Sequence, residues 1–309
     1  MMKGLRKAYG ETLVELAGEN KNIVDLEADL SKSTMGTFFE AKYPERFFEM
    51  GIAEANMASV AAGLSLTGKI PFMNSFAVFS TGRCYDQIRT SICIPNLNVK
   101  ICGSSAGLSD FGDGSTHQTV EDMATMRALP NMKVFSPVDA NQVASIVRYM
   151  AANQGPMYIR INRNDLPVLT EENQEFIPGK VYTMREGKDA VVFATGVMVS
   201  IALAAAEDLA KEGIDLKVVN VPSIKPIDAD AVAYIAGSVK GVVTAEEHSV
   251  IGGLGSAICE CLAPRIAKKV FFVGIQDRFG TSGENYDVLL NGYGLTKENI
   301  VASVKKSLE

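Results

Sequence analysis

Apolar residues recur along the chain at two alternating spacings, and the alternation predicts the secondary structure. Leu5, Tyr9 and Leu13 share one face of a helix, and the apolar run at 22–27 that follows is typical of a buried strand. The same step repeats, with strands predicted at 46–50, 69–73, 97–102, 132–136 and 157–161 and helices at 54–66, 78–92, 120–129 and 140–152. Strands separated by such helices indicate a mostly parallel sheet covered on both faces.

A polar stretch then interrupts the pattern. From Asn164 to Gly187 the chain holds two prolines and has no helical period, which is typical of a linker. The alternation restarts afterwards, with strands predicted at 189–196, 215–221, 241–247 and 270–274 and helices at 198–212, 228–236, 254–262 and after 296. We therefore predict an α/β fold of two domains, 1–170 and 188–309, each a mostly parallel sheet flanked by helices, joined by a linker at 171–187.

Composition narrows the class of protein. A chain of 309 residues, 47% hydrophobic and 21% charged, is long enough to bury two cores. Its 30 basic and 36 acidic residues give a net charge of −6, which argues against a nucleic-acid partner. The sequence shows no signal peptide and no membrane-spanning run, and its five cysteines match neither a zinc nor a redox spacing. We expect a cytoplasmic protein with reduced thiols and no membrane partner.

Two segments carry candidate chemistry. The loop at 103–123 gathers glycines, acids and His117 after a predicted parallel strand, where open α/β sheets place their ligands. Histidine also caps helices, so Asp113 and His117 stay candidates on pattern alone. Glu54 begins a helix rich in Ala, Gly and Ser, whose small side chains suit a close subunit interface. Taken alone, this glutamate could equally be a solvated residue that stabilises a helix N-terminus.

Three segments read in order show a family resemblance. FFEMGIAEANMASVAAGLSLTGKIPF, NSFAVFSTGRCYDQIR and GDGSTHQTVEDMATMRALPNMKVFSPVDA resemble the transketolase family. The resemblance covers essentially the whole chain, but only the thiamine-diphosphate-fold pyrimidine domain and the C-terminal domain of that family. The chain thus resembles the C-terminal section of a split transketolase, which works with a separate N-terminal section.

The resemblance implies thiamine diphosphate as cofactor. Glu54 matches the glutamate that shares a proton with the pyrimidine N1′. Phe79 matches the residue that stacks on the pyrimidine, with Phe76 beside it, although both could instead be core side chains. Asp29 matches an acid at the boundary between the cofactor and the neighbouring subunit. The Mg²⁺ and diphosphate ligands are expected on the partner subunit, so we expect no metal ligand in this chain.

The resemblance also implies a sugar-phosphate site. Arg6, Ser33 and Arg163 match phosphate-binding positions, although surface charge is the alternative for the two arginines. Asp113 and His117 match residues that contact the donor hydroxyls and the developing intermediate, which gives His117 a catalytic role beside Glu54.

The chain departs from the family at 103–116. A histidine that usually precedes this turn is replaced by Gly103 or a neighbouring serine, and the loop is longer, which puts substrate contacts there in question. GDG at 112–114 resembles a cofactor metal motif, but THQ follows directly, so we assign it to the substrate loop. IGGLGSAI lacks the third glycine of a dinucleotide motif, and His248 before it is interpreted as structural.

These residues predict the C-terminal subunit of a two-component transketolase of the pentose phosphate pathway. It would move a two-carbon ketol unit from a ketose phosphate to an aldose phosphate, within a heterotetramer built on a homodimer of this chain. Alternatives are a beta chain of a 2-oxoacid dehydrogenase decarboxylase, a 1-deoxyxylulose-5-phosphate synthase-like enzyme, or a non-catalytic binding protein. THQ and the phosphate-type arginines favour transketolase over the beta chain. A 1-deoxyxylulose-5-phosphate synthase shares THQ but is normally one long chain. The retention of Glu54, Phe79, Asp113 and His117 argues against a binding protein.

Overall fold

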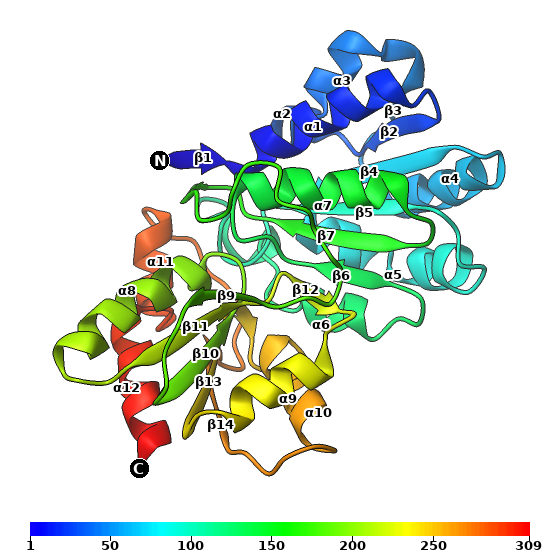
Figure 1. Cartoon of the computed structure of the whole chain (residues 1–309). Coiled ribbons are helices and arrows are strands. Elements are labelled where there is room, and N and C mark those ends of the chain that lie inside the picture. The colour runs from blue at the N-terminus through cyan, green and yellow to red at the C-terminus, as the bar shows by residue number, and fades with distance from the viewer.

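The computed structural model describes all residues 1–309 (Figure 1). The largest of its three sheets has seven strands. Its order is β12-β6-β7-β5-β4-β2-β3, and all neighbours are parallel except β12, which runs antiparallel to β6. The strands are β2 (Ile23–Glu27), β3 (Phe47–Glu49), β4 (Ile70–Phe76), β5 (Lys100–Ser104), β6 (Lys133–Phe135), β7 (Met157–Ile161) and β12 (Ser223–Lys225). The predicted α/β fold is confirmed.

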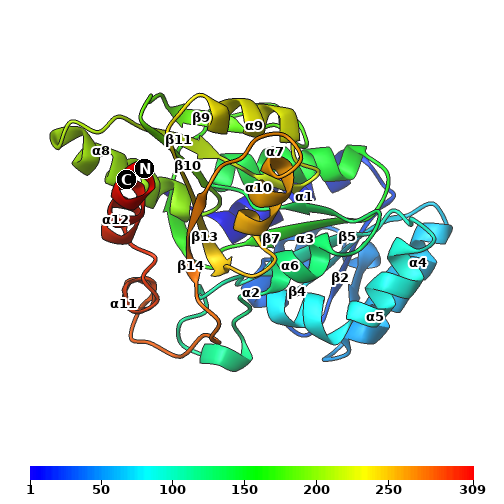
Figure 2. The same cartoon turned by 90° about the horizontal axis from the view of Figure 1, so that it is seen from below.

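Helices cover both faces of this sheet (Figure 2). One face carries α1 (Leu5–Glu19), α3 (Thr37–Lys42) and α7 (Ala140–Ala152), and the other carries α4 (Glu54–Leu66), α5 (Tyr85–Gln87) and α6 (Asp122–Arg127). The strand period decides which residue meets which face: Ile23 packs with α1, whereas Val24 and Leu26 pack with α4. Short helical turns lie at α2 (Ser31–Thr34), η1 (Pro44–Arg46) and η4 (Gly114–Thr116).

The second sheet repeats this design with five strands in the order β14-β13-β10-β11-β9. Its strands are β9 (Tyr182–Arg185), β10 (Ala190–Ala194), β11 (Leu216–Asn220), β13 (Gly241–Ser249) and β14 (Val270–Ile275). The helices α8 (Met198–Lys211) and α12 (Lys297–Leu308) lie on one face and α9 (Ala229–Gly237) and α10 (Leu254–Leu262) on the other, with α11 (Tyr286–Gly292) preceding α12 (Figure 1). The strands β1 (Met2–Gly4) and β8 (Asp165–Pro167) form a separate antiparallel pair.

The two parts of the chain are packed together. β12 comes from the C-terminal part yet pairs with β6 in the first sheet. Each of the two large apolar clusters also draws on both parts, with Ile161 and Ile275 in one and Met132 and Ile224 in the other. The C-terminal part is therefore positioned to support loops of the first sheet.

The structure contains elements that the sequence pattern did not predict, and two of them change the description of long segments. The single helix predicted at 78–92 is divided into the π-helical turns η2 (Phe79–Arg83) and η3 (Ile88–Cys93) on either side of α5. The hydroxyl of Thr81 donates to the Ala77 carbonyl (2.6 Å) at the point where regular helix is lost. The segment 171–187 contains β9, an edge strand too short to show a period; the domain boundaries at 170 and 187 stay predictions.

Candidate active site

Five loops meet at the carboxyl ends of the first sheet's strands. Phe76, Ser104 and Ile161 lie in register at the ends of β4, β5 and β7, so the segments that follow them start side by side. Every predicted site residue except Arg6 lies at or after such a strand end: Asp29 and Ser33 after β2, Glu54 after β3, Phe76 and Phe79 around the end of β4, Asp113 and His117 after β5, and Arg163 after β7. This edge of a parallel sheet is where α/β proteins bind ligands.

An aromatic cluster, formed by Phe76, Phe79 and His117, lies at the end of β4. The two phenyl rings are nearly parallel, with centroids 6.0 Å apart. His117 meets Phe79 edge-on at 5.3 Å and Phe76 at 6.2 Å. Its Nδ1 lies 2.9 Å from the Thr116 hydroxyl, and the side chain is only partly buried. Three residues singled out in two separate segments thus contact one another.

Glu54 is the first residue of α4, and its carboxyl is linked to this cluster through Arg83. The side chain is only 5% exposed, and its Oε1 accepts a hydrogen bond from Arg83 Nη1 (2.8 Å). The Arg83 guanidinium also lies over the Phe79 ring, 4.0 Å from its centroid. Sequence reasoning missed Arg83, although its place four residues after Phe79 on a predicted helix was a signal that the two side chains would be neighbours.

Arg6 and Arg163 form an arginine pair near the aromatic cluster. The Arg6 side chain donates to the backbone carbonyl of Ser33 (2.7 Å), and Arg163 lies 5.9 Å from the Phe76 ring centroid. Burial and the neighbouring Arg163 lower the pKa of the Arg6 guanidinium. Two cations this close repel each other, so an anion placed between them would be stabilised.

Asp110 is a second residue that sequence reasoning missed. It accepts a hydrogen bond from Arg163 (2.7 Å), and burial raises the pKa of its carboxyl although Arg163 acts in the opposite direction. It lies in the loop already singled out for its acids, three residues before Asp113. Asp113 itself is exposed, and its side chain makes no hydrogen bond or ion pair.

Asp29 lies apart from both groups. It lies two residues after the end of β2 with a left-handed backbone (φ 59°), and its N–H donates to the Glu49 carboxylate (2.8 Å), which also accepts from the Gly51 N–H (2.9 Å). No hydrogen bond or ion pair joins its exposed side chain to Glu54 or to the arginine pair. Glu49 thereby fixes the turn that leads into Glu54.

The C-terminal part holds the loop at 103–118 in place. The amide of Gln118 donates to the carbonyls of Asp110 (2.9 Å) and Thr281 (3.0 Å), and Gly283 donates to the Phe111 carbonyl (2.8 Å). Glu247 accepts a hydrogen bond from the Leu108 N–H (2.8 Å) at the other end of the loop. The loop that carries Asp113 and His117 is thus anchored on either side of them by residues of the C-terminal part, Glu247 in β13 and Thr281 and Gly283 in the loop after β14.

A buried ion pair reinforces this junction. The Arg160 guanidinium binds both carboxylate oxygens of Asp122 (2.9 and 3.0 Å) and donates to the backbone carbonyl of Glu247 (3.2 Å). Burial raises the pKa of Glu247 to about 7. His248 is buried nearby, where its Nε2 accepts from the Ala124 N–H (3.3 Å), and burial lowers its pKa to about 4.

Two carboxyls in the strand β2 are also buried beneath the site. Asp25 accepts a hydrogen bond from the Asn74 amide, and Glu27 accepts one from the Thr34 hydroxyl (2.6 Å). Burial raises the pKa of both acids well above the ordinary range. The sequence pattern described this strand as buried but gave no sign that its polar side chains would be enclosed with it.

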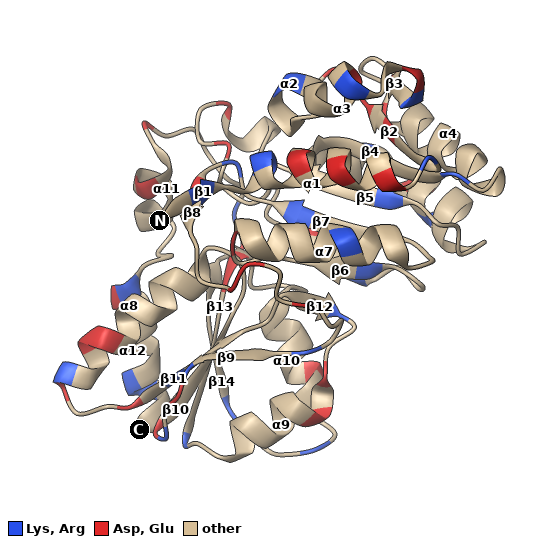
Figure 3. Cartoon of the chain, turned by 45° about the horizontal axis from the view of Figure 1, so that its top comes forward, with Lys and Arg blue, Asp and Glu red and all other residues tan.

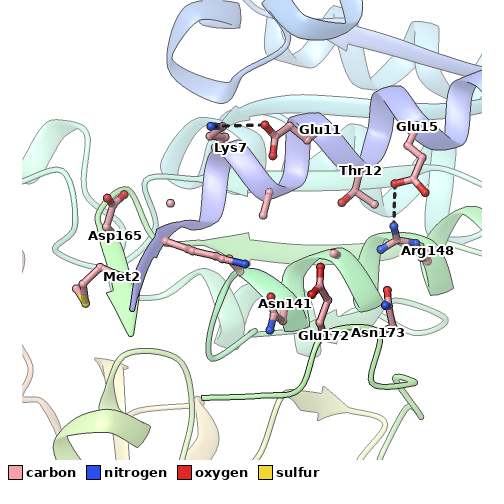
Figure 4. Close-up of a pocket in the computed structure, with 15 residues that line it drawn as sticks. Met2, Lys7, Glu11, Thr12, Glu15, Asn141, Arg148, Asp165, Glu172 and Asn173 are labelled. Atoms are coloured by element: carbon pink, nitrogen blue, oxygen red, sulfur yellow. Dashed lines mark hydrogen bonds and ion pairs between the residues drawn. The ribbon is translucent and has the colours of Figure 1, made fainter. Parts of the chain in front are cut away.

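A large groove lies away from these residues. It measures about 530 Å³ between α1 and α7, and two pairs of its charges are joined, Lys7 with Glu11 (3.6 Å) and Arg148 with Glu15 (2.8 Å) (Figure 4). No predicted site residue lines it. The predicted site residues therefore lie outside this groove.

Acidic and basic residues are interspersed over both parts of the chain (Figure 3). No three His, Cys, Asp or Glu side chains are grouped so as to hold a metal ion. None of the helices has the length and apolar character needed to cross a bilayer. All five cysteines are free thiols.

The fold and these residues define a two-part α/β protein whose first sheet carries a buried acid beside aromatic rings and an arginine pair. Residues 2–168 match the family "Transketolase, pyrimidine binding domain", and residues 179–300 match "Transketolase, C-terminal domain". The chain belongs to the transketolase family.

Three similar proteins cover almost the whole chain. A solved structure titled "Split gene transketolase, inactive beta4 tetramer" is 49% identical, covers 99% of both chains and has a TM-score of 0.90. The "6-deoxy-6-sulfo-D-fructose transketolase subunit" of Clostridium sp. (strain MSTE9) is 43% identical over 99% of this chain and 94% of its own length. One of the subunits of the apulose-4-phosphate transketolase of Phocaeicola vulgatus is 34% identical over 97% of this chain and 96% of its own length.

Proposed function

We propose that this chain is the C-terminal subunit of a two-component, thiamine-diphosphate-dependent transketolase that moves a two-carbon ketol unit from a ketose phosphate to an aldose phosphate. Its relatives of similar length are named as transketolase subunits or as a split-gene transketolase. The partner is an N-terminal subunit that carries the Mg²⁺ and diphosphate ligands. Two copies of each subunit would form a heterotetramer in the cytoplasm, within the pentose phosphate pathway.

The residues present fit the pyrimidine end of the cofactor. The buried carboxyl of Glu54 and the Phe79 ring already hold one flat cationic group between them, the guanidinium of Arg83. An aminopyrimidine is also planar, and its nitrogens can share a proton with a carboxyl group. When bound, thiamine diphosphate supplies the carbanion that accepts and donates the ketol unit.

Glu54 would hold a proton at the pyrimidine N1′. Its low exposure keeps water from competing for that proton, and its position in the first turn of α4 fixes the carboxyl. Phe79 would orient the ring by stacking, with Phe76 supporting it from within the sheet. Asp29, in the turn that follows β2, would border the cofactor where the subunits meet.

The sugar would lie between the aromatic cluster and the arginine pair. His117, whose ring is partly exposed, would hydrogen-bond the hydroxyl or carbonyl oxygen at which charge develops, and Asp113 would bind a donor hydroxyl. Arg6 and Arg163 would bind the phosphate, with Ser33 adding a hydroxyl beside Arg6. Asp110 holds Arg163 in the orientation that this contact requires.

The observation that carries the proposal is the position of the arginine pair. Arg163 lies 5.9 Å from the Phe76 centroid, so one small ligand can reach the aromatic cluster and the two guanidinium groups together. A ketose phosphate has that combination of a reactive carbonyl at one end and a dianion at the other. The 2-oxoacid substrate of the alternative beta chain does not require a phosphate. The arginine pair therefore favours a ketose phosphate over a 2-oxoacid.

The direct experiment is a reconstitution. This chain is assayed with xylulose 5-phosphate and ribose 5-phosphate, thiamine diphosphate and Mg²⁺, with and without its N-terminal partner. Ketol transfer is expected only from the two together, because the proposal assigns the diphosphate and metal ligands to the partner. Appreciable transfer by the chain alone, or none by the reconstituted pair with any sugar phosphate, would contradict the proposal.

A further inference from the structure

We propose that, in the cofactor-free chain, the Arg83 side chain occupies the binding site of the cofactor's pyrimidine ring and must leave this site when the cofactor binds. This inference rests on the proposed function, because it takes Glu54 and Phe79 as the groups that hold the pyrimidine. Arg83 would be a positioning residue that holds Glu54 and Phe79 in place before the cofactor binds.

The geometry of Arg83 reproduces the two contacts expected of the pyrimidine. One nitrogen of its guanidinium donates to Glu54 Oε1 at 2.8 Å, as a protonated ring nitrogen would. The carbon of the same planar group lies 4.0 Å from the Phe79 centroid, which is a stacking distance. No other cationic or planar group makes both contacts, so the guanidinium and a bound pyrimidine would compete for the same two partners.

The burial of Glu54 and Phe79 explains why the pyrimidine site needs a bound group even without the cofactor. Glu54 is 5% exposed, and a carboxylate that deeply buried is costly without a partner. Phe79 is 8% exposed, so almost none of its ring is free for a ligand while the present neighbours stay in place. An arginine in this position compensates the carboxylate and covers the ring until the cofactor replaces it.

Among the neighbours of Phe79, Arg83 is the one best placed to move away. Its side chain is 50% exposed, whereas Phe76 is 3% exposed and fixed at the end of a central strand. Arg83 is also the last residue of η2, a π-helical turn of the kind often found at functional sites. A rotation of its long side chain would free both partners without any change in the backbone.

The test uses the whole purified chain and a probe of the pyrimidine half of the cofactor, 4-amino-2-methylpyrimidine. Arg83→Ala removes the occupant, and Arg89→Ala removes an exposed arginine of the neighbouring turn η3 that makes no ion pair. Thermal unfolding is followed as the probe concentration rises, since a ligand that binds only the folded chain raises Tm.

The probe is expected to stabilise Arg83→Ala at a concentration at least about tenfold lower than it does the parent chain or Arg89→Ala. Adding Glu54→Gln to Arg83→Ala should remove most of this gain. Equal responses of Arg83→Ala and the parent would overturn the inference. If Arg83→Ala proves too unstable to assay, Arg83→Gln, which loses the charge but keeps a polar side chain, decides by the same comparison.

Failure of this inference can be told apart from failure of the proposed function. If the reconstituted pair transfers ketol units but Arg83→Ala responds to the probe like the parent, only the role of Arg83 is wrong. If Arg83→Ala gains probe binding but the reconstituted pair of subunits transfers no ketol units, Arg83 does cover a ring-binding site and the proposed reaction is wrong.

Discussion

The ion pair between Arg160 and Asp122 offers a quantitative test of how the two parts of the chain depend on each other. Arg160 is 6% exposed and Asp122 is fully buried. The change Arg160→Met keeps the length of the side chain but leaves the Asp122 carboxylate with the Tyr158 hydroxyl (2.7 Å) as its remaining side-chain partner. It also removes both hydrogen bonds to the Glu247 carbonyl in the C-terminal part.

The expected cost follows from burial. Breaking a buried pair by removing one partner costs about 3–5 kcal/mol, because the remaining charge is uncompensated. At about 2–4 °C for each kcal/mol in chains of this size, Tm should fall by roughly 6–20 °C. Arg148→Met is the matched control, since Arg148 pairs with Glu15 on the surface, where such pairs contribute about 0–1 kcal/mol.

The assay is thermal unfolding for Tm and urea unfolding for the free energy, both followed by circular dichroism at pH 7.5. The double change Arg160→Met with Asp122→Asn should be less destabilised than Arg160→Met alone, because it leaves no buried charge. If Arg160→Met costs no more than Arg148→Met, or if the double variant is the less stable of the two, the reasoning about the buried junction is refuted.

Three further predictions concern the phosphate site, the α4 face and the junction. Arg6→Met should raise the KM for a sugar phosphate about 10- to 100-fold in the reconstituted pair with little change in kcat, whereas the exposed Lys7→Met should not. Gly63→Arg places a long charged side chain on the exposed face of α4, where no atom lies within 4 Å of a new Cβ, so sedimentation should show loss of self-association without unfolding. Burial raises the pKa of Glu247 from 4.5 to about 7, so the folded chain holds a proton there that the unfolded chain releases. Stability from this group is therefore present below about pH 4.5 and lost as the pH rises through about 7, and Glu247→Gln should reduce the fall in unfolding free energy between pH 5 and pH 8.

The hydrophobic pattern predicted the parallel strands and long helices well, because their spacing is repeated over many residues. The helices at 54–66, 140–152 and 254–262 begin and end where the structure has them. The pattern failed for β1, β8, β9 and β12, which are too short to show a period and are held by pairing with distant strands. It also missed the division of 78–92, which depends on hydrogen bonds of Thr81 and its neighbours rather than on hydrophobicity.

The site residues divide in the same way. Phe79 and His117 could be singled out because their segments resemble a known family, and they do lie together. Asp110 and Arg83 contact Arg163 and Glu54. The spacing of Arg83 from Phe79 indicated that these two side chains are neighbours, but neither its contact with Glu54 nor that of Asp110 with Arg163 could be predicted, because each joins residues from different segments of the chain.

The measurement that tests the central claim most directly is hydrogen–deuterium exchange at C2 of thiamine diphosphate in the reconstituted pair. Glu54→Gln keeps the size of the side chain and a hydrogen-bonding group but cannot hold the acidic proton at N1′. Exchange should slow about 10²–10⁴-fold, while Glu45→Gln, an exposed acid on η1, should leave it unchanged. Exchange at the parent rate in Glu54→Gln would contradict the account, because Glu54 would then not be the group that activates the cofactor.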